Sequence, residues 1–297
     1  MMKIPKVVCY GEVLFDKLPT VKKIGGAPLN VAIRVNSLGG QAQLISSVGA
    51  DQEGNEIIDY LNALDFPTDF IQTCQHYPTG EAKVSLDDKG NATYEIKHPV
   101  AWDQITLNQN ITTLVAQSDA LIFGSLSNRD KKSRTTLLEL LKLAKYSVLD
   151  LNLRAPHYEQ STLKELILNA DLIKCSDEEF NEITSLYKST YNSIELNVQY
   201  IAKITKTKSI CITMGANGAL FYYDSKFYYC DGYDINVVDT VGAGDSFLAG
   251  LVIQLLQNNN KPQYALNFAC ATGAMVAQNS GANPKIHLHD IIEIMST

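Results

Sequence analysis

The sequence has no excess of basic residues and no long apolar run. Its 297 residues include 25 lysines and arginines against 32 aspartates and glutamates, a formal net charge of −7. This balance argues against nucleic acid and against an anionic membrane as partners, because both recruit basic surfaces. The N-terminal stretch MMKIPKVVCYGEVLFD breaks its apolar residues with Lys, Pro, Gly and Glu, which is typical of neither a signal peptide nor a membrane span. We therefore expect a cytoplasmic protein.

Several sequence frameworks are missing as well. The six cysteines are scattered without a CxxC pair, and the five histidines show no zinc spacing, which predicts reduced and mostly buried thiols. No GxxxxGK[ST] loop occurs, so the chain has no Walker A motif. The GAGDSF stretch at 242–247 lacks the third glycine of a dinucleotide fingerprint, which disfavours a nicotinamide dehydrogenase.

Apolar runs bounded by turn residues alternate with helical stretches along the chain. Strands are expected at 6–16, 42–49, 119–125, 146–152, 170–175 and 209–215, and helices at 28–40, 53–64, 133–146, 196–205 and from 246 to 255. Strands of this kind, buried on both faces and joined by helices, favour an α/β fold with a mostly parallel central sheet between two helical layers. We expect one domain over residues 1–297.

The stretch 79–96 departs from this rhythm. Two alternating segments flank the sequence DDKGN at 87–91, which predicts a β-hairpin where a helix would be expected. It is either an edge hairpin on the main sheet or a small β lid over a site at the carboxyl ends of the strands. A second hairpin at 218–230 is interpreted as an extension of the sheet.

The sequence DTVGAGDSFLAGL at 239–251 carries the strongest chemical signal. A Gly-Ala-Gly turn before a helix presents free backbone N–H groups and the positive end of the helix dipole, which attract a phosphate. Asp245 stands at that turn, where it is either a simple helix cap or a general base beside an anion site. Phosphoryl transfer needs both features, because amides stabilise the charge on the phosphoryl oxygens while a carboxylate takes the proton of the attacking alcohol.

The same stretch resembles the C-terminal signature of the PfkB (ribokinase-like) carbohydrate kinases, and GGAPLNVAIRVNSLGG at 25–40 is similar to their N-terminal signature. Further similar segments follow in the family's order: Asp16, DLNLR at 150–154, KCSDEE at 174–179 and TMGANG at 213–218. The resemblance implies a ribokinase-like three-layer fold with a small β lid, whose strands come from about 13–24 and 79–100. It also implies ATP and Mg²⁺ as cofactors.

Roles follow from the resemblance residue by residue. It implies a catalytic base at Asp245 with an anion hole at Gly242, Ala243 and Gly244. Substrate-binding residues would be Asp16, Gly25, Gly26, Asn30 and Arg154. Nucleotide-binding residues would be Lys174, Glu179, Thr213, Gly215, Gly218, Asn279 and Asn283. Glu179 would hold Mg²⁺ through water, and Asp239, Val241 and Ser280 are candidates for a monovalent cation site that takes K⁺. The common family residue at position 176 is Asn, where this chain has Ser.

Within the family, GEVLFD, GGAPLNVA, HPVAWD and the SDEE segment look most like fructokinases. The resemblance therefore implies transfer of the γ-phosphoryl group of ATP to the primary hydroxyl of fructose. Kinases for ribose, 2-keto-3-deoxygluconate or a nucleoside share the same signatures, and a catalytically silent sugar- or nucleotide-binding paralogue is the other reading. The expected partners are a small sugar and ATP, with a homodimer formed through the lid.

Overall fold

A computed structural model describes residues 3–17, 21–86, 92–257 and 261–296. Its strands are β1 (Lys6–Tyr10), β2 (Leu14–Lys17), β3 (Lys22–Gly25), β4 (Gln41–Gly49), β5 (Ile71–Cys74), β6 (Gly80–Leu86), β7 (Ala92–Ile96), β8 (Ala120–Gly124), β9 (Ser147–Asp150), β10 (Leu172–Ser176), β11 (Ser209–Thr213), β12 (Ala219–Tyr223) and β13 (Lys226–Cys230). Its α-helices are α1 (Ala27–Ser37), α2 (Gln52–Ala63), α3 (Gln109–Gln117), α4 (Lys131–Leu141), α5 (Gln160–Leu168), α6 (Asp177–Leu186), α7 (Ile194–Thr205), α8 (Ala243–Gln257), α9 (Pro262–Ala277) and α10 (Leu288–Ile294). Short 3₁₀ turns lie at Ala101–Gln104, Leu126–Asn128 and Gly215–Asn217.

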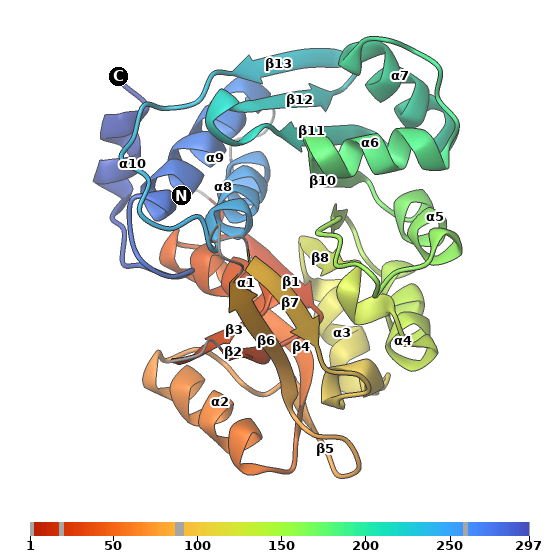
Figure 1. Ribbon diagram of the computed structural model, residues 1–297, viewed down its shortest axis with the longest axis vertical. Helices are drawn as coiled ribbons and strands as arrows, with labels where there is room; N and C mark the ends of the chain where they lie inside the picture. Colours follow the sequence, from red (N-terminus) through yellow and green to blue (C-terminus); the bar gives the residue numbers. More distant parts are fainter. Residues whose placement is uncertain (1–2, 18–20, 87–91, 258–260, 297) are drawn as a thin grey trace.

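The larger sheet has nine strands in the order β13-β12-β11-β10-β9-β8-β1-β4-β5. The pairs from β5 to β11 are parallel, whereas β12 and β13 extend the sheet antiparallel. This order gives the expected α/β fold, and the hairpin of β12 and β13 extends the sheet (Figure 1). Because the parallel strands run the same way, their carboxyl ends meet at one edge, which is where open α/β sheets bind ligands.

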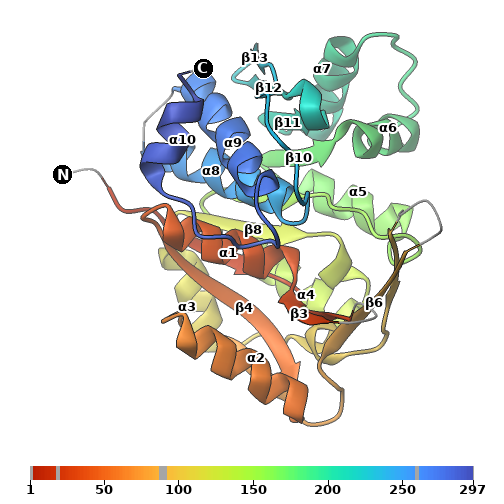
Figure 2. The same ribbon diagram turned by 60° about the vertical axis from the view of Figure 1, so that its left-hand side comes forward.

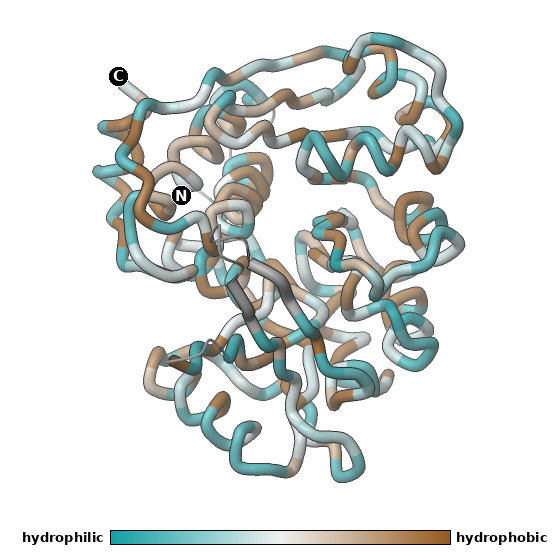
Figure 3. The backbone as a smooth tube through the Cα atoms, in the orientation of Figure 1, coloured by the Kyte–Doolittle hydropathy of each residue, from teal (hydrophilic) through white to brown (hydrophobic). Residues whose placement is uncertain are grey.

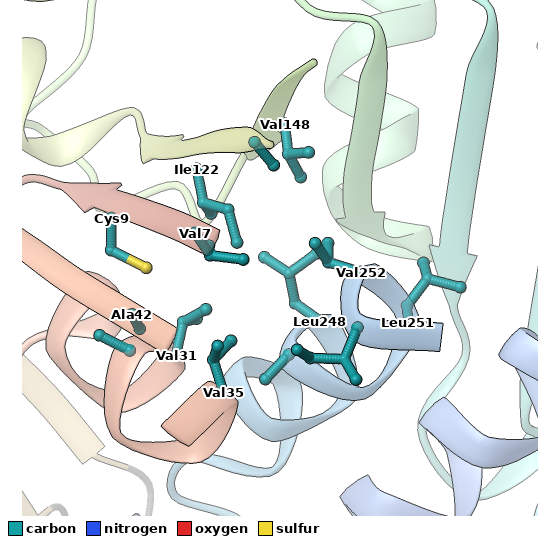
Figure 4. Close-up of a cluster of buried hydrophobic side chains, with 14 of the residues drawn as sticks. Val7, Cys9, Val31, Val35, Ala42, Ile122, Val148, Leu248, Leu251 and Val252 are labelled. Atoms are coloured by element: carbon teal, nitrogen blue, oxygen red, sulfur yellow. The ribbon is translucent and has the colours of Figure 1, made fainter. Parts of the chain in front are cut away.

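Helices cover both faces of this sheet. On one face, residues of α1, α2, α8 and α9 share one apolar core with the strands. Figure 4 shows side chains of α1 and α8 around Val7, Ile122 and Val148 in this core. On the other face, α3, α4, α5, α6 and α7 pack on the alternate residues of the same strands, among them Val8 and Leu149. Successive residues of one strand thus enter opposite cores, which explains why these strands are continuously apolar.

Local signals in the sequence set where helices begin. The Asp51 side chain accepts a hydrogen bond from Gly54 N–H at the start of α2, and Ser176 with Glu179 forms a capping box at the start of α6. Pro28 stands in the first turn of α1, where its missing N–H costs nothing. The outer helices α2 and α6 alternate hydrophilic and hydrophobic residues along their length, as a helix with one buried face does (Figure 3).

A second sheet of four strands has the order β3-β2-β6-β7. Its middle strands β2 and β6 are parallel, and the outer pairs are antiparallel. Figure 2 shows β3 and β6 outside the layers formed by the main sheet and its helices. The expected turn at 87–91 lies outside the described residues.

The expectation of one continuous strand over 6–16 is wrong. The chain leaves the main sheet after Tyr10, and β2 begins the second sheet at Leu14. Gly11 makes the break with φ 148°, and a Cβ there would overlap Pro28 and Ser127. The apolar pattern of residues 6–16 gave no signal of this change of sheet.

Helix α8 also begins earlier than expected, at Ala243, which places Asp245 inside its first turn. Among the described residues, no helix combines the length and the apolar character needed to cross a bilayer.

Candidate functional site

The candidate site is built around the start of α8, at the carboxyl edge of the main sheet. Gly242 has φ 76°, and a Cβ there would press into Ala282, so the turn lies directly against the segment 279–284. Ala243 N–H donates to Thr240 O at 3.2 Å. Within the described residues, the N–H groups of Gly244 and Asp245 have no recorded acceptor, as expected in a first helical turn. The turn therefore offers two backbone donors at the positive end of a helix.

The Asp245 carboxylate is held by a relay of two amides. Asn30 Nδ2 in α1 donates to Asp245 Oδ2 at 2.8 Å, and Asn30 Oδ1 accepts from Asn283 Nδ2 at 2.8 Å. The second bond fixes the amide of Asn30 so that its NH₂ group faces Asp245. Oδ1 of Asp245 has no recorded donor among the described residues, so it is available to accept a proton.

The surroundings make this carboxyl group more basic. Removal from solvent raises the pKa of Asp245 to about 6, and the negative charge of Asp150 adds to the rise. The hydrogen bond from Asn30 and the charges of Lys174 and Arg154 act in the opposite direction. A carboxyl group with a pKa near 6 is ionised at neutral pH and still basic enough for proton transfer.

Lys174 lies next to the turn. Its buried Nζ is 3.0 Å from Asp150 Oδ1, and a Cβ on Gly244 would stand 3.2 Å from the same Nζ. Asp150 Oδ2 is also buried and has no hydrogen-bond partner among the described residues. The ion pair therefore places the Lys174 ammonium group beside the start of α8, together with Asp150 Oδ2, an acceptor that has no partner among the described residues.

Asp16, Gly25 and Gly26 form the side of the site that faces the second sheet. Asp16 lies in β2, and a Cβ on Gly25 would overlap its carboxylate. Burial raises the pKa of Asp16 to about 6, against the opposing charges of Arg154 and Lys23. Gly26 has φ 120° just before α1, where a Cβ would meet Glu12 O. Both glycines therefore allow a close approach that other residues would block.

Arg154 is exposed, and its Nη1 donates to Leu153 O at 3.3 Å. Its charge lowers the pKa of three carboxyl groups, those of Glu12, Asp16 and Asp245. Arg154 therefore lies close enough to these three acidic residues for its charge to affect their pKa values.

Glu179 is anchored at the start of α6. Its Oε1 accepts from Leu153 N–H at 2.6 Å and its Oε2 from Ser176 N–H at 2.9 Å. Ser176, which stands where the family commonly has Asn, and Glu179 therefore form the capping box at the start of α6. The same bonds fix the orientation of the carboxylate and leave lone pairs on both oxygens.

The TMGANG segment follows β11. Thr213 Oγ1 donates to Cys175 O at 3.3 Å. Gly215 and Gly218 both have positive φ values, 55° and 84°, and a Cβ on Gly218 would overlap Cys230 O. Asn279 turns back onto α9 and donates to Met275 O at 2.8 Å, so no recorded bond joins it to the other candidates.

Asp239 connects the two segments that flank the turn. Its Oδ1 accepts from Val241 N–H at 3.0 Å and its Oδ2 from Gly281 N–H at 2.9 Å. The candidates for the monovalent cation site, Asp239, Val241 and Ser280, therefore lie on neighbouring segments.

Sequence reasoning missed Glu12 as a site residue. Glu12 follows β1, is 3% exposed, and its Oε2 has no hydrogen-bond partner among the described residues. Burial raises its pKa to about 7, and the charges of Asp245 and Asp150 add to the rise. Its only signal in the sequence is a carboxylate between a glycine and an apolar run.

Arg34 was missed too. It is 1% exposed in α1, where its Nε donates to Ser246 Oγ at 3.1 Å and its Nη2 to Pro284 O at 3.1 Å. Burial lowers the pKa of this guanidinium to about 10. Arg34 therefore ties α1 both to the residue after Asp245 and to the residue after Asn283.

The spacing of the histidines in the sequence predicts no metal site, but the fold brings three possible metal ligands together. Ligand atoms of His98, Asp103 and Asp130 lie within 4.8 Å of one another. The Asp103 carboxylate, however, already accepts two bonds of 2.8 Å from Arg129, which also stacks on Trp102. An arginine thus supplies the positive charge that a metal would bring.

Comparisons with known proteins identify the family of this chain. The family model described as pfkB family carbohydrate kinase matches residues 5–288. Probable fructokinase-7 of Arabidopsis thaliana is 31% identical over 316 residues, which cover 97% of this chain and 91% of the relative. Fructokinase of Xylella fastidiosa with bound ATP has a TM-score of 0.85 at 23% identity, with 98% of each chain covered. A double mutant of Vibrio cholerae O395 fructokinase with bound fructose, ADP and potassium has a TM-score of 0.85 at 22% identity, with 99% of each chain covered. Together with the Asp245 turn, these matches show that the chain belongs to the pfkB family of carbohydrate kinases.

Proposed function

We propose that the protein is an ATP-dependent fructokinase in which Asp245 is the general base. The observation that carries this proposal is the half-buried Asp245 carboxylate, one oxygen of which has no donor among the described residues, at a helix start that also offers backbone donors. The names of the relatives favour fructose as the sugar, and the structures similar in fold include forms with ATP and with fructose and ADP.

In the proposed reaction, Asp245 Oδ1 accepts the proton of the 6-hydroxyl group of fructose. The hydroxyl oxygen attacks the γ-phosphorus of ATP, the bond from that phosphorus to the β–γ bridging oxygen breaks, and ADP leaves. The N–H groups of Gly244 and Asp245 stabilise the charge on the phosphoryl oxygens, with Gly242 and Ala243 shaping the turn. The second sheet closes over the sugar and excludes water.

The sugar contacts are assigned to Asp16, Gly25, Gly26, Asn30 and Arg154. A carboxylate accepts from sugar hydroxyls, an amide both donates and accepts, and the glycines let the ring approach the backbone. Asn30 then has two tasks, because its NH₂ group also orients Asp245.

The nucleotide is assigned to Lys174, Thr213, Gly215, Gly218, Asn279 and Asn283. The residues present also fit a bound Mg²⁺, since Glu179 has lone pairs on an oriented carboxylate and Asp150 Oδ2 is a buried acceptor without a partner among the described residues. Mg²⁺ held through water by these groups would neutralise charge on the phosphates. Asp239, Val241 and Ser280 would hold K⁺ beside the turn, which is supported by the potassium in the Vibrio structure.

The deciding experiment is an ADP-release assay with fructose, ribose, 2-keto-3-deoxygluconate and a nucleoside at equal concentrations, with and without Mg²⁺ and K⁺. We expect the highest kcat/KM for fructose. A higher value for another substrate would reassign the sugar within the family, whereas no ADP with any of them would leave a silent paralogue and reject the kinase proposal.

We also propose a homodimer formed through the second sheet. Strands β3 and β7 end that sheet, so each has one backbone edge without a strand partner among the described residues. Sedimentation at several protein concentrations tests this, and a monomer at every concentration would reject it. The proposed compartment is the cytoplasm, which cell fractionation tests.

A further inference from the structure

The contact between α1 and α8 has an apolar part and a polar part. Val31 and Val35 of α1 lie in the same buried cluster as Leu248 of α8 (Figure 4). Apolar packing is non-directional, so it does not by itself fix which residues of the two helices stand opposite one another. At the start of α8 the contacts are hydrogen bonds, which are directional and can fix this alignment.

Two residues on one face of α1 make these polar contacts. Asn30 forms the amide relay described above, and Arg34 lies four positions later, one turn along the helix. Arg34 Nε donates to Ser246 Oγ at 3.1 Å, and its Nη2 donates to Pro284 O at 3.1 Å. Ser246 and Pro284 directly follow the two residues that Asn30 contacts. Both side chains therefore bridge the first turn of α8 and the segment 279–284.

Packing alone does not account for an arginine at position 34. The side chain is buried, and within the described residues no ion pair joins it to a carboxylate. Its recorded acceptors are all neutral: Ser246 Oγ, Pro284 O and, at 3.4 Å, Ser37 Oγ. Burying a cation costs free energy that hydrogen bonds to neutral groups offset only in part. What the guanidinium supplies is a rigid planar fork whose donors point in fixed directions.

We propose that Arg34 is a positioning residue for the general base. Its contacts to α8 and to the segment 279–284 hold these two elements at the separation at which Asn30 reaches Asp245 and Asn283 together. This inference rests on the proposed role of Asp245 in the reaction.

The effect of Arg34 passes through the amide relay. Pro284 O, which Arg34 holds, belongs to the residue next to Asn283. Without this contact Asn283 loses the directional support beside it, and its bond to Asn30 Oδ1 weakens. Asn30 then loses the bond that turns its NH₂ group toward Asp245.

The test follows the titration of Asp245 in the full-length protein, which needs no turnover. Carbon-13 in the aspartate carboxyl groups reports their titration by NMR, and Asp245→Asn identifies the signal of Asp245. The bond from Asn30 lowers the pKa of Asp245, so a weaker bond should raise it. We expect the midpoint to rise by about 0.5 to 1 pH unit in Arg34→Met, as for the loss of one hydrogen bond. An unchanged midpoint in this variant overturns the proposal.

Two further variants separate the fork from the charge and test the relay. Arg34→Lys keeps the positive charge without the planar fork, so we expect the midpoint to rise here as well. A wild-type midpoint in Arg34→Lys would mean that the charge is sufficient, which also overturns the proposal. This variant decides the question if urea unfolding shows that Arg34→Met does not fold. Asn283→Ala leaves Arg34 in place and removes the bond to Asn30, so its midpoint should rise, and an unchanged value would exclude the relay.

Ser37→Ala is the matched control, because it removes the 3.4 Å contact of Arg34 and neither of the two bridging contacts. Its midpoint should stay at the wild-type value, and a rise of the same size would overturn the proposal by indicating a general loosening of α1. The other titratable groups around Asp245 are the same in the Arg34, Asn283 and Ser37 variants: Cys9, Glu12, Asp150, Arg154 and Lys174. A failed fructokinase proposal would appear differently, as no ADP release by the wild type, while the titration of Asp245 could still be measured.

Discussion

Asn30 Nδ2 lies 2.8 Å from Asp245 Oδ2, although the two residues are 215 positions apart in the chain. This bond joins the two PfkB signatures, since α1 carries the first and α8 the second. It orients the Asp245 carboxylate and leaves Oδ1 without a donor among the described residues. The first two predictions concern this contact.

Asp245→Asn removes the base and keeps the contact, because the new amide oxygen still accepts from Asn30. We expect kcat to fall by about 10²-fold to 10⁴-fold, the usual contribution of a general base. Thermal unfolding and nucleotide binding should stay near the wild-type values, which serves as the control for folding. Near-normal turnover in this variant would reject Asp245 as the base.

The acidic limb of the pH profile should report Asp245. Its raised pKa of about 6 means that kcat at saturating sugar falls as the pH drops through 6, because the base becomes protonated. The Asn30 bond lowers this pKa, so Asn30→Ala should move the limb to higher pH. The matched control is Asn169→Ala, at the end of α5, which should leave the limb in place. If the acidic limb of Asn30→Ala lies at the same pH as that of the wild type, the assignment of this limb to Asp245 is contradicted.

The hydrophobic pattern of the sequence was sufficient to predict an α/β fold with a mostly parallel sheet between two layers of helices. The strands of the parallel sheet other than β5, and several of its helices, were expected close to their observed positions, since continuous apolar runs and amphipathic stretches have few other uses. The short strand β5 was not expected. The passage from β1 to β2 was not expected either, because apolar residues stand at both 7–10 and 13–15 and the change of sheet depends on tertiary contacts of Gly11 with Pro28 and Ser127.

The site was predicted as a set of motifs and not as a set of contacts. The resemblance placed Asn30, Asn283 and Asp245 in three separate roles, whereas the structure joins them in one relay. Glu12 and Arg34 were missed because each lies inside an apolar or amphipathic stretch and acquires its environment only when distant segments pack around it. No sequence spacing reports such burial.

Asp16→Ala should chiefly weaken sugar binding. Loss of a charged hydrogen-bond acceptor typically costs about 1.5–3 kcal/mol, so we expect the KM for fructose to rise by about 10-fold to 100-fold with a smaller change in kcat. Lys17→Ala is the matched control on the same strand, since Lys17 forms a half-exposed ion pair with Glu81 that contributes little. An unchanged KM for the sugar in Asp16→Ala would remove Asp16 from the sugar contacts.

Glu12→Gln should stabilise the protein at alkaline pH. The pKa of Glu12 is raised in the folded state to about 7 from an ordinary value of 4.5, so the folded protein binds this proton more tightly than the unfolded chain. The stability that Glu12 contributes is therefore present below about pH 4.5 and is lost as the pH rises to about 7. The pKa difference corresponds to about 3 kcal/mol, which is the order of the gain expected for the neutral glutamine at pH 8. Urea unfolding at pH 5 and pH 8 measures it, with the exposed Glu293→Gln as the matched control. If Glu12→Gln gains no stability relative to the wild type between these two pH values, Glu12 is not a buried acid with a raised pKa.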